Sequence, residues 1–107
     1  MDTLEKLKNN GIIVNYAEIA KLCKKYSVME LSIFGSSIRN DFTAKSDIDI
    51  LVSFAEDAQI SLFDIMDLEN EFAQLLGRDV EILEVKAIKN PIRRESILST
   101  REIIYAD

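Results

Sequence analysis

The segment from Ser61 to Gly77 constrains the fold most, because it has the pattern of a complete amphipathic helix between two apolar strands. Ser61 is a favoured N-cap residue, and glycine is the residue type that most often follows the end of a helix. The apolar positions between them recur at the helical spacing: Ile65, Leu68, Phe72 and Leu75. The flanking segments, residues 48–53 and 80–85, are rich in Ile, Leu and Val, as strands are. This arrangement predicts an α/β domain.

The rest of the chain adds further elements to this unit. Asn15 with Glu18 indicates a capping box, and Asn90 before Pro91 is a typical helix start. The expected further elements are helices over 3–9, 16–26 and 91–99, a short turn or helix start over 36–40, and strands over 29–34 and 101–105. We therefore expect one domain over residues 1–107, with an α/β (α+β) fold in which helices flank a small mixed β-sheet.

The composition limits the chemistry. The 107 residues include no histidine, so a metal site must use oxygen ligands, which favours hard cations such as Mg²⁺. The single cysteine, Cys23, is expected in the core. The formal net charge of −6 opposes direct nucleic-acid binding. No apolar run is long enough to span a membrane and the charged start is no secretory signal, so we expect a cytoplasmic protein without membrane association.

The first candidate site segment follows the strand expected over 29–34. Gly35, Ser36 and Ser37 would present backbone N–H groups and hydroxyls at the end of that strand, which suits phosphate oxygens. Arg39 adds a guanidinium that can bind phosphate through two hydrogen bonds. A Gly-Ser turn alone is common, so its interpretation depends on the residues that follow it.

The second candidate segment is acidic. Asp47 and Asp49 stand two apart in an expected strand, so both carboxylates lie on one face, about 6.5–7 Å apart at the backbone. They repel each other unless a cation lies between them. Glu81 alternates with apolar neighbours in the next strand and joins the cluster if the two strands are adjacent, although Asp79 could equally be the third member. Three carboxylates can hold two divalent ions about 3.5–4 Å apart.

The order of these features carries a family resemblance. The stretch from Gly35 to Val52, with Gly-Ser, an Arg and then Asp-x-Asp, resembles the signature of the polymerase-β nucleotidyltransferase superfamily. The tight spacing and the Ser46-Asp47-Ile48-Asp49 sequence resemble its smallest branch, the minimal nucleotidyltransferases, and the resemblance covers roughly residues 31–105. The chain departs from that branch at Glu81, where Asp is usual, and at Asn40, where Gly is frequent.

The resemblance implies a role for each matching residue. Gly35, Ser36 and Arg39 would bind the triphosphate of ATP. The catalytic residues, which would also hold two Mg²⁺ ions, are Asp47, Asp49 and Glu81. Glu81 would in addition help to deprotonate the acceptor hydroxyl.

The resemblance also implies a partner. Many minimal nucleotidyltransferases of this type are antitoxins that pair with a helical HEPN-domain toxin, a ribonuclease, and in such pairs the transferase moves AMP from ATP onto a tyrosine of the toxin. We therefore expect an AMP-transferring antitoxin that forms a hetero-oligomer with its toxin. Two alternatives remain open at this point: a degenerate antitoxin that neutralises its partner by contact alone, and a small-molecule nucleotidyltransferase similar to the aminoglycoside-modifying enzymes.

Overall fold

The computed structural model describes residues 3–38, 43 and 46–107, and within them four strands form one mixed sheet. The strands are β1 (Val28–Phe34), β2 (Ile48–Phe54), β3 (Val80–Glu84) and β4 (Glu102–Ala106). Their order across the sheet is β3-β2-β1-β4. β1 runs antiparallel to both of its neighbours, whereas β2 and β3 are parallel. The predicted α/β fold with a small mixed sheet is therefore confirmed.

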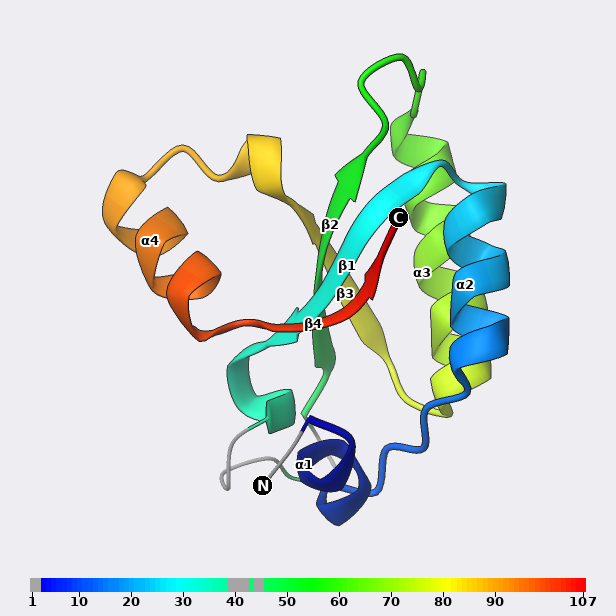
Figure 1. The fold of residues 1–107 in the computed structure, drawn as a ribbon, viewed down its shortest axis with the longest axis vertical. Helices are drawn as coiled ribbons and strands as arrows, with labels where there is room; N and C mark the ends of the chain where they lie inside the picture. Colours follow the sequence, from blue (N-terminus) through cyan, green and yellow to red (C-terminus); the bar gives the residue numbers. More distant parts are fainter. Residues whose placement is uncertain (1–2, 39–42, 44–45) are drawn as a thin grey trace.

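Helices cover both faces of this sheet (Figure 1). The α-helices are α1 (Thr3–Asn9), α2 (Tyr16–Lys25), α3 (Leu62–Leu76) and α4 (Pro91–Thr100), and the 3-10 turns are η1 (Gly35–Ile38) and η2 (Val85–Ala87). The boundaries differ from the sequence-based ones at element ends. Val85, expected in a strand, begins η2, and Arg101 is the C-cap of α4 rather than the first residue of β4.

The predicted end signals of α3 are present. The Ser61 hydroxyl accepts a hydrogen bond from the backbone N–H of Asp64, and the Asp64 carboxylate accepts one from the N–H of Ser61. At the other end, Gly77 adopts the left-handed conformation with φ of 69° and donates its N–H to the carbonyl of Ala73. The helix therefore has a fixed length, which determines where the chain re-enters the sheet as β3.

The main core lies between the sheet and the pair of helices α2 and α3, which stand side by side on one face (Figure 1). α3 contributes Leu68, Phe72 and Leu76, while the predicted stripe members Ile65 and Leu75 are half-buried. Cys23 on α2 is fully buried, as expected, and burial raises the pKa of its thiol to about 12. At neutral pH this cysteine is therefore a protonated core residue.

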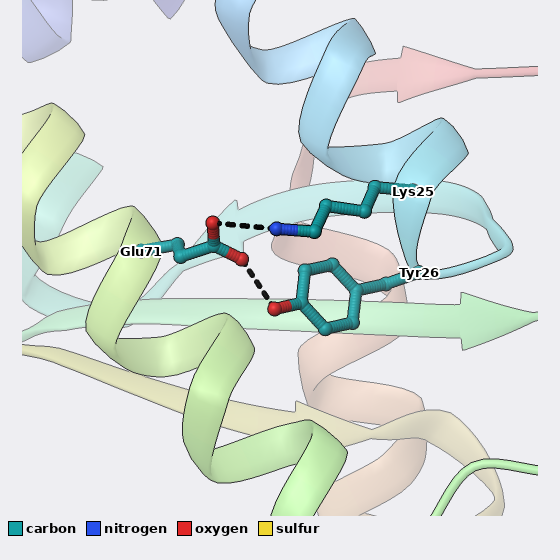
Figure 2. A network of polar contacts seen from close by, with 3 residues as sticks. All are labelled: Lys25, Tyr26 and Glu71. Carbon is teal, nitrogen blue, oxygen red and sulfur yellow. Dashed lines mark hydrogen bonds and ion pairs between the residues drawn. The ribbon is translucent and has the colours of Figure 1, made fainter.

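A polar network joins α2 to α3 at the edge of this core (Figure 2). The Glu71 carboxylate accepts hydrogen bonds from the Tyr26 hydroxyl and from the Lys25 ammonium group, the latter at 2.9 Å. The hydrogen bond to Glu71, together with burial, raises the pKa of Tyr26 to about 12. Conversely, the bonds from Tyr26 and Lys25 hold the pKa of Glu71 below its usual range.

The opposite face of the sheet carries α4 and a second, smaller core (Figure 1). Leu51 on β2 packs there with Ile88 and with Ile97 of α4. Side chains alternate along β2, so Ile48, Ile50 and Val52 point into the main core while Asp49 and Leu51 face α4. None of the helices in the described ranges is both long and apolar enough to cross a bilayer.

Candidate active site

The pairing of β2 with β3 brings two of the predicted carboxylates together. In this parallel pair, Asp49 is the register partner of Glu81. Register partners in neighbouring strands project from the same face, so both carboxylates lie on the face that α4 partly covers. Val80 and Ile82 pack against the main core on the other face, which fixes the orientation of Glu81. The two strands are therefore adjacent, which is the condition under which the sequence predicted that Glu81 joins Asp49.

Gly35 lies against the Asp49 carboxylate. It follows β1 directly and has a φ of +71°, a conformation that residues with a Cβ seldom adopt. A Cβ at this position would lie 2.4 Å from Oδ2 of Asp49. Glycine is therefore required at this position for two reasons: the chain turns into η1 with a positive φ, and the Asp49 carboxylate occupies the space of a Cβ. The predicted phosphate-binding turn and the predicted metal ligand are in direct contact.

Ser37 and Asn10 hold this turn in place. Ser37 was expected to face phosphate as part of the turn, whereas Asn10 was not among the predicted site residues. Ser37 is fully buried, and its hydroxyl accepts a hydrogen bond of 3.3 Å from the backbone N–H of Asp49. Its carbonyl accepts a bond of 2.7 Å from the side-chain amide of Asn10, just beyond α1. Gly35 and Ser36, by contrast, are partly exposed. Ser37 therefore attaches η1 to β2 and to the segment after α1, while the first two residues of the turn remain accessible to a ligand.

Asp47 lies immediately before β2 rather than inside it, because the strand begins at Ile48. It is exposed, and two described residues that precede it, Thr43 and Ser46, are bound by a residue from a distant part of the chain. One guanidinium nitrogen of Arg78, Nη2, donates to the carbonyl of Thr43 at 2.7 Å and to that of Ser46 at 2.9 Å. Arg78 follows α3 and precedes Asp79, so it links the start of β3 to Thr43 and to Ser46, the residue before Asp47.

Asp79, the alternative third carboxylate, also lies before its strand and is exposed. Its carbonyl accepts the backbone N–H of Ile48 at 2.9 Å, which aligns the beginnings of β2 and β3. The backbone of Asp79 thus has a structural role in the register of the sheet, while Glu81 occupies the position beside Asp49.

The candidate ligand atoms are carboxylate oxygens, which suit a hard divalent cation, but the described side chains do not converge on a common point. All candidate ligands are carboxylates, and they are placed at the amino ends of two adjacent strands. Among the described residues, no group of three or more His, Cys, Asp or Glu side chains is arranged to hold a metal ion. The metal roles of Asp47, Asp49 and Glu81 therefore stay predictions. Arg39 and Asn40 lie outside the described residues.

Sequence comparison places most of the chain in one family. Residues 17–107 match the family described as Polymerase beta, Nucleotidyltransferase. A Methanocaldococcus jannaschii protein whose name proposes a protein adenylyltransferase is 40% identical over 98% of this chain and 99% of its own length. The protein adenylyltransferase MntA of Thermococcus cleftensis is 31% identical over 98% of this chain and 97% of its own. The resemblance seen from Gly35 to Val52 is confirmed.

Solved structures share the fold. The structure of a proposed minimal nucleotidyltransferase has a TM-score of 0.68 and 30% identity, and covers 94% of each chain. A toxin–antitoxin structure with AMP-PNP has a TM-score of 0.70 at 20% identity, covering 88% of this chain and 75% of the other. A Shewanella oneidensis complex of a tri-AMPylated HEPN toxin with an MNT antitoxin has a TM-score of 0.62 at 18% identity, covering 94% and 73%.

Proposed function

The chain belongs to the polymerase beta nucleotidyltransferase family, and we propose that it transfers AMP from ATP to a hydroxyl group of a partner protein. The observation that carries this proposal is the contact between the Gly35 turn and Asp49, with Glu81 as the register partner of Asp49. A phosphate-binding turn beside paired carboxylates is what a reaction at a triphosphate requires. The names of the full-length relatives support adenylyl transfer in particular.

The residues of the site would divide the work between them. The N–H groups of the turn at Gly35 and Ser36, together with Arg39, would bind the triphosphate of ATP. Two Mg²⁺ ions held by the three carboxylates would neutralise phosphate charge and lower the pKa of the acceptor hydroxyl. The ligands in this proposal are Asp47, Asp49 and Glu81.

The proposed transfer forms one bond to phosphorus, breaks another and moves one proton. The oxygen of the acceptor hydroxyl forms a bond to the α-phosphorus of ATP, and the bond from that phosphorus to the bridging oxygen breaks. Pyrophosphate leaves, and the hydroxyl proton passes to a carboxylate, for which Glu81 is the candidate base. Glu81 suits this task because it is exposed and lies beside Asp49, so an acceptor can approach it from solvent.

The proposed acceptor is a tyrosine of a HEPN-domain toxin, so that the chain acts as an antitoxin within a hetero-oligomer. Two structural neighbours support this partner, since each is described as a toxin–antitoxin complex and one contains a tri-AMPylated HEPN toxin. The net charge of −6 also suits a protein acceptor better than a nucleic acid.

The first test is nucleotide binding by the purified chain. Mg²⁺ with ATP should raise the melting temperature, because the complex binds only the folded state. ATP with EDTA should give a much smaller shift. A folded protein whose melting temperature does not move at millimolar Mg²⁺–ATP would contradict the proposal.

The second test is transfer to the partner. A purified partner toxin should gain the mass of AMP when incubated with the chain, Mg²⁺ and ATP, and toxin activity should fall as it does so. Inhibition that needs no ATP and leaves the toxin mass unchanged would instead support a degenerate antitoxin that acts by contact.

A further inference from the structure

We propose that the chain forms a two-fold symmetric dimer through the edge of the sheet opposite the carboxylates. Three large apolar side chains at the start of α3 are exposed. On the first turns of α3, Leu62 is 79% exposed, Phe63 77% and Met66 57%. They lie off the face of α3 that packs into the core, and contiguous exposed apolar side chains of this size mark interaction sites.

Acidic residues flank this apolar cluster in the sequence, and we call the cluster the α3 patch. The segment 56–67 contains four acidic residues and no basic ones: Glu56, Asp57, Asp64 and Asp67. Asp64 is used in capping α3, whereas Glu56, Asp57 and Asp67 are exposed. A surface that fits the α3 patch should therefore combine an apolar recess with a basic rim.

The same chain presents such a surface. A pocket of about 180 Å³ lies at the carboxyl ends of β2 and β3, lined by Ser53, Phe54, Glu84, Val85, Lys86 and Arg94. Phe54 and Val85 give it apolar walls, and a cavity of roughly this size can hold a benzene ring. The segment 84–95 contains four basic residues, Lys86, Lys89, Arg93 and Arg94, and two acidic ones, Glu84 and Glu95, so its net charge is positive. All four basic residues are exposed, and none forms an ion pair with another described residue.

The topology places both surfaces at the same edge of the molecule. β2 and β3 are parallel, so the pocket lies where both strands end, and α3 begins at that same edge (Figure 1). Phe63 is exposed, so it does not occupy the pocket of its own chain. Two copies that meet through this edge can each insert the α3 patch into the other's pocket, which is the reciprocal pattern of a two-fold interface. Asp49 and Glu81, near the amino ends of these strands, remain uncovered.

The test is the mass of the full chain in solution, measured by sedimentation equilibrium over a range of concentrations. The wild type should approach the mass of a dimer as concentration rises. Phe63→Ser should weaken dimerisation by at least about tenfold, because it removes the side chain that fills the pocket. Arg94→Glu should weaken it similarly, because it places an acidic group opposite an acidic patch.

The matched control is Ile13→Ser. Ile13 is 80% exposed, like Phe63, but lies between α1 and α2, so its removal should leave the dimer intact. Circular dichroism would verify that each variant is folded. A wild type that stays monomeric at high concentration would overturn the proposal, as would a dimer that persists in both Phe63→Ser and Arg94→Glu. These outcomes do not depend on adenylyl transfer, so they are independent of the proposed function.

Discussion

The position that a Cβ of residue 35 would occupy lies 2.4 Å from Oδ2 of Asp49, so Gly35 and Asp49 share one space. Gly35→Ala should therefore force the Asp49 carboxylate to rotate away and should strain the backbone at a φ of +71°. We expect transfer to fall sharply while the protein still folds. Transfer rates and melting temperatures measured on the same preparation would test this.

Gly11 and Gly77 provide the control, because both have positive φ values and neither has an atom within 4 Å of an added Cβ. Gly11→Ala and Gly77→Ala should each lose about 1–2 kcal/mol of stability through backbone strain alone and keep their transfer rate. If Gly35→Ala loses no more activity than these two variants, the contact between Gly35 and Asp49 does not affect the rate of AMP transfer.

Asp47→Asn and Asp49→Asn should abolish transfer without unfolding the protein. Each substitution keeps the size of the side chain and removes only a proposed metal ligand, so the unliganded protein should remain folded. The informative comparison is thermal stability with and without Mg²⁺–ATP, which should shift the wild type but neither variant. An Asn variant that transfers AMP at the wild-type rate would disprove the metal assignment.

The Tyr26–Glu71 bond predicts how stability changes with pH. The pKa of Tyr26 is about 12 in the folded protein, against about 10 in an unfolded chain. Its stabilising effect is therefore complete below pH 10 and is lost as pH rises from about 10 to 12. The difference in unfolding free energy between wild type and Tyr26→Phe should thus be smaller at pH 11 than at pH 8.

At acid pH the Glu71 carboxylate of the same pair changes stability in the opposite direction: its contribution is lost as pH falls. The pKa of Glu71 is lowered in the folded protein, so its contribution to stability is present above its unfolded pKa and is lost as pH falls through the folded pKa.

The control for the Tyr26→Phe experiment is Tyr16→Phe, which removes a hydroxyl from an exposed tyrosine on α2. A difference between wild type and Tyr26→Phe that is constant from pH 8 to 11 would contradict the role of this hydrogen bond.

Local signals in the sequence were enough to predict most elements of the fold. The ends of α3 depend on Ser61 and Gly77, which act on neighbouring backbone groups, so the pattern of residues indicates them directly. The face on which Glu81 lies also follows from alternation with its apolar neighbours. Likewise, Gly35 was predicted at a turn because glycine is the residue that accommodates a positive φ.

The remaining features depend on contacts between distant residues. Whether Glu81 would lie beside Asp49 depended on strand order, which the sequence pattern did not specify. The bond between Arg78 and Thr43 spans 35 positions, and nothing local marks either residue as part of the site. The sequence predicts Ser37 only as part of a ligand-binding turn, because its burial depends on β2 lying beside β1 and on the bond from the N–H of Asp49.

Arg78 should contribute to the reaction without contacting substrate. It holds the carbonyls of Thr43 and Ser46 in front of Asp47, so Arg78→Gln should lower transfer by roughly ten- to a hundredfold through misplacement of Asp47. The Mg²⁺ concentration for half-maximal activity should rise as well, which a general loss of stability would not cause. Both bonds come from one nitrogen, Nη2, and the ammonium group of a lysine can also donate to two carbonyls, so Arg78→Lys should recover part of the activity. Unchanged Mg²⁺ dependence in Arg78→Gln would rule out this positioning role.

Glu81 and Asp79 can be separated because the structure places them differently. Glu81 is inside β3 as the partner of Asp49, while Asp79 precedes the strand and contributes its carbonyl to the bond with Ile48. Glu81→Gln should therefore lower transfer by about a hundredfold or more, since it removes a proposed ligand and the candidate base. Asp79→Asn keeps the carbonyl and should cost much less.

Glu81→Asp completes this comparison, because it keeps the charge and shortens the side chain by one methylene group. It should retain partial activity, since aspartate is the usual residue here in the resembled branch. The measurement is AMP transfer from labelled ATP to the purified partner toxin, with all three variants at equal folded concentration. If Asp79→Asn were inactive and Glu81→Gln active, the third carboxylate would be Asp79, and the acceptor would have to approach from the start of β3 rather than from the face shared with Asp49.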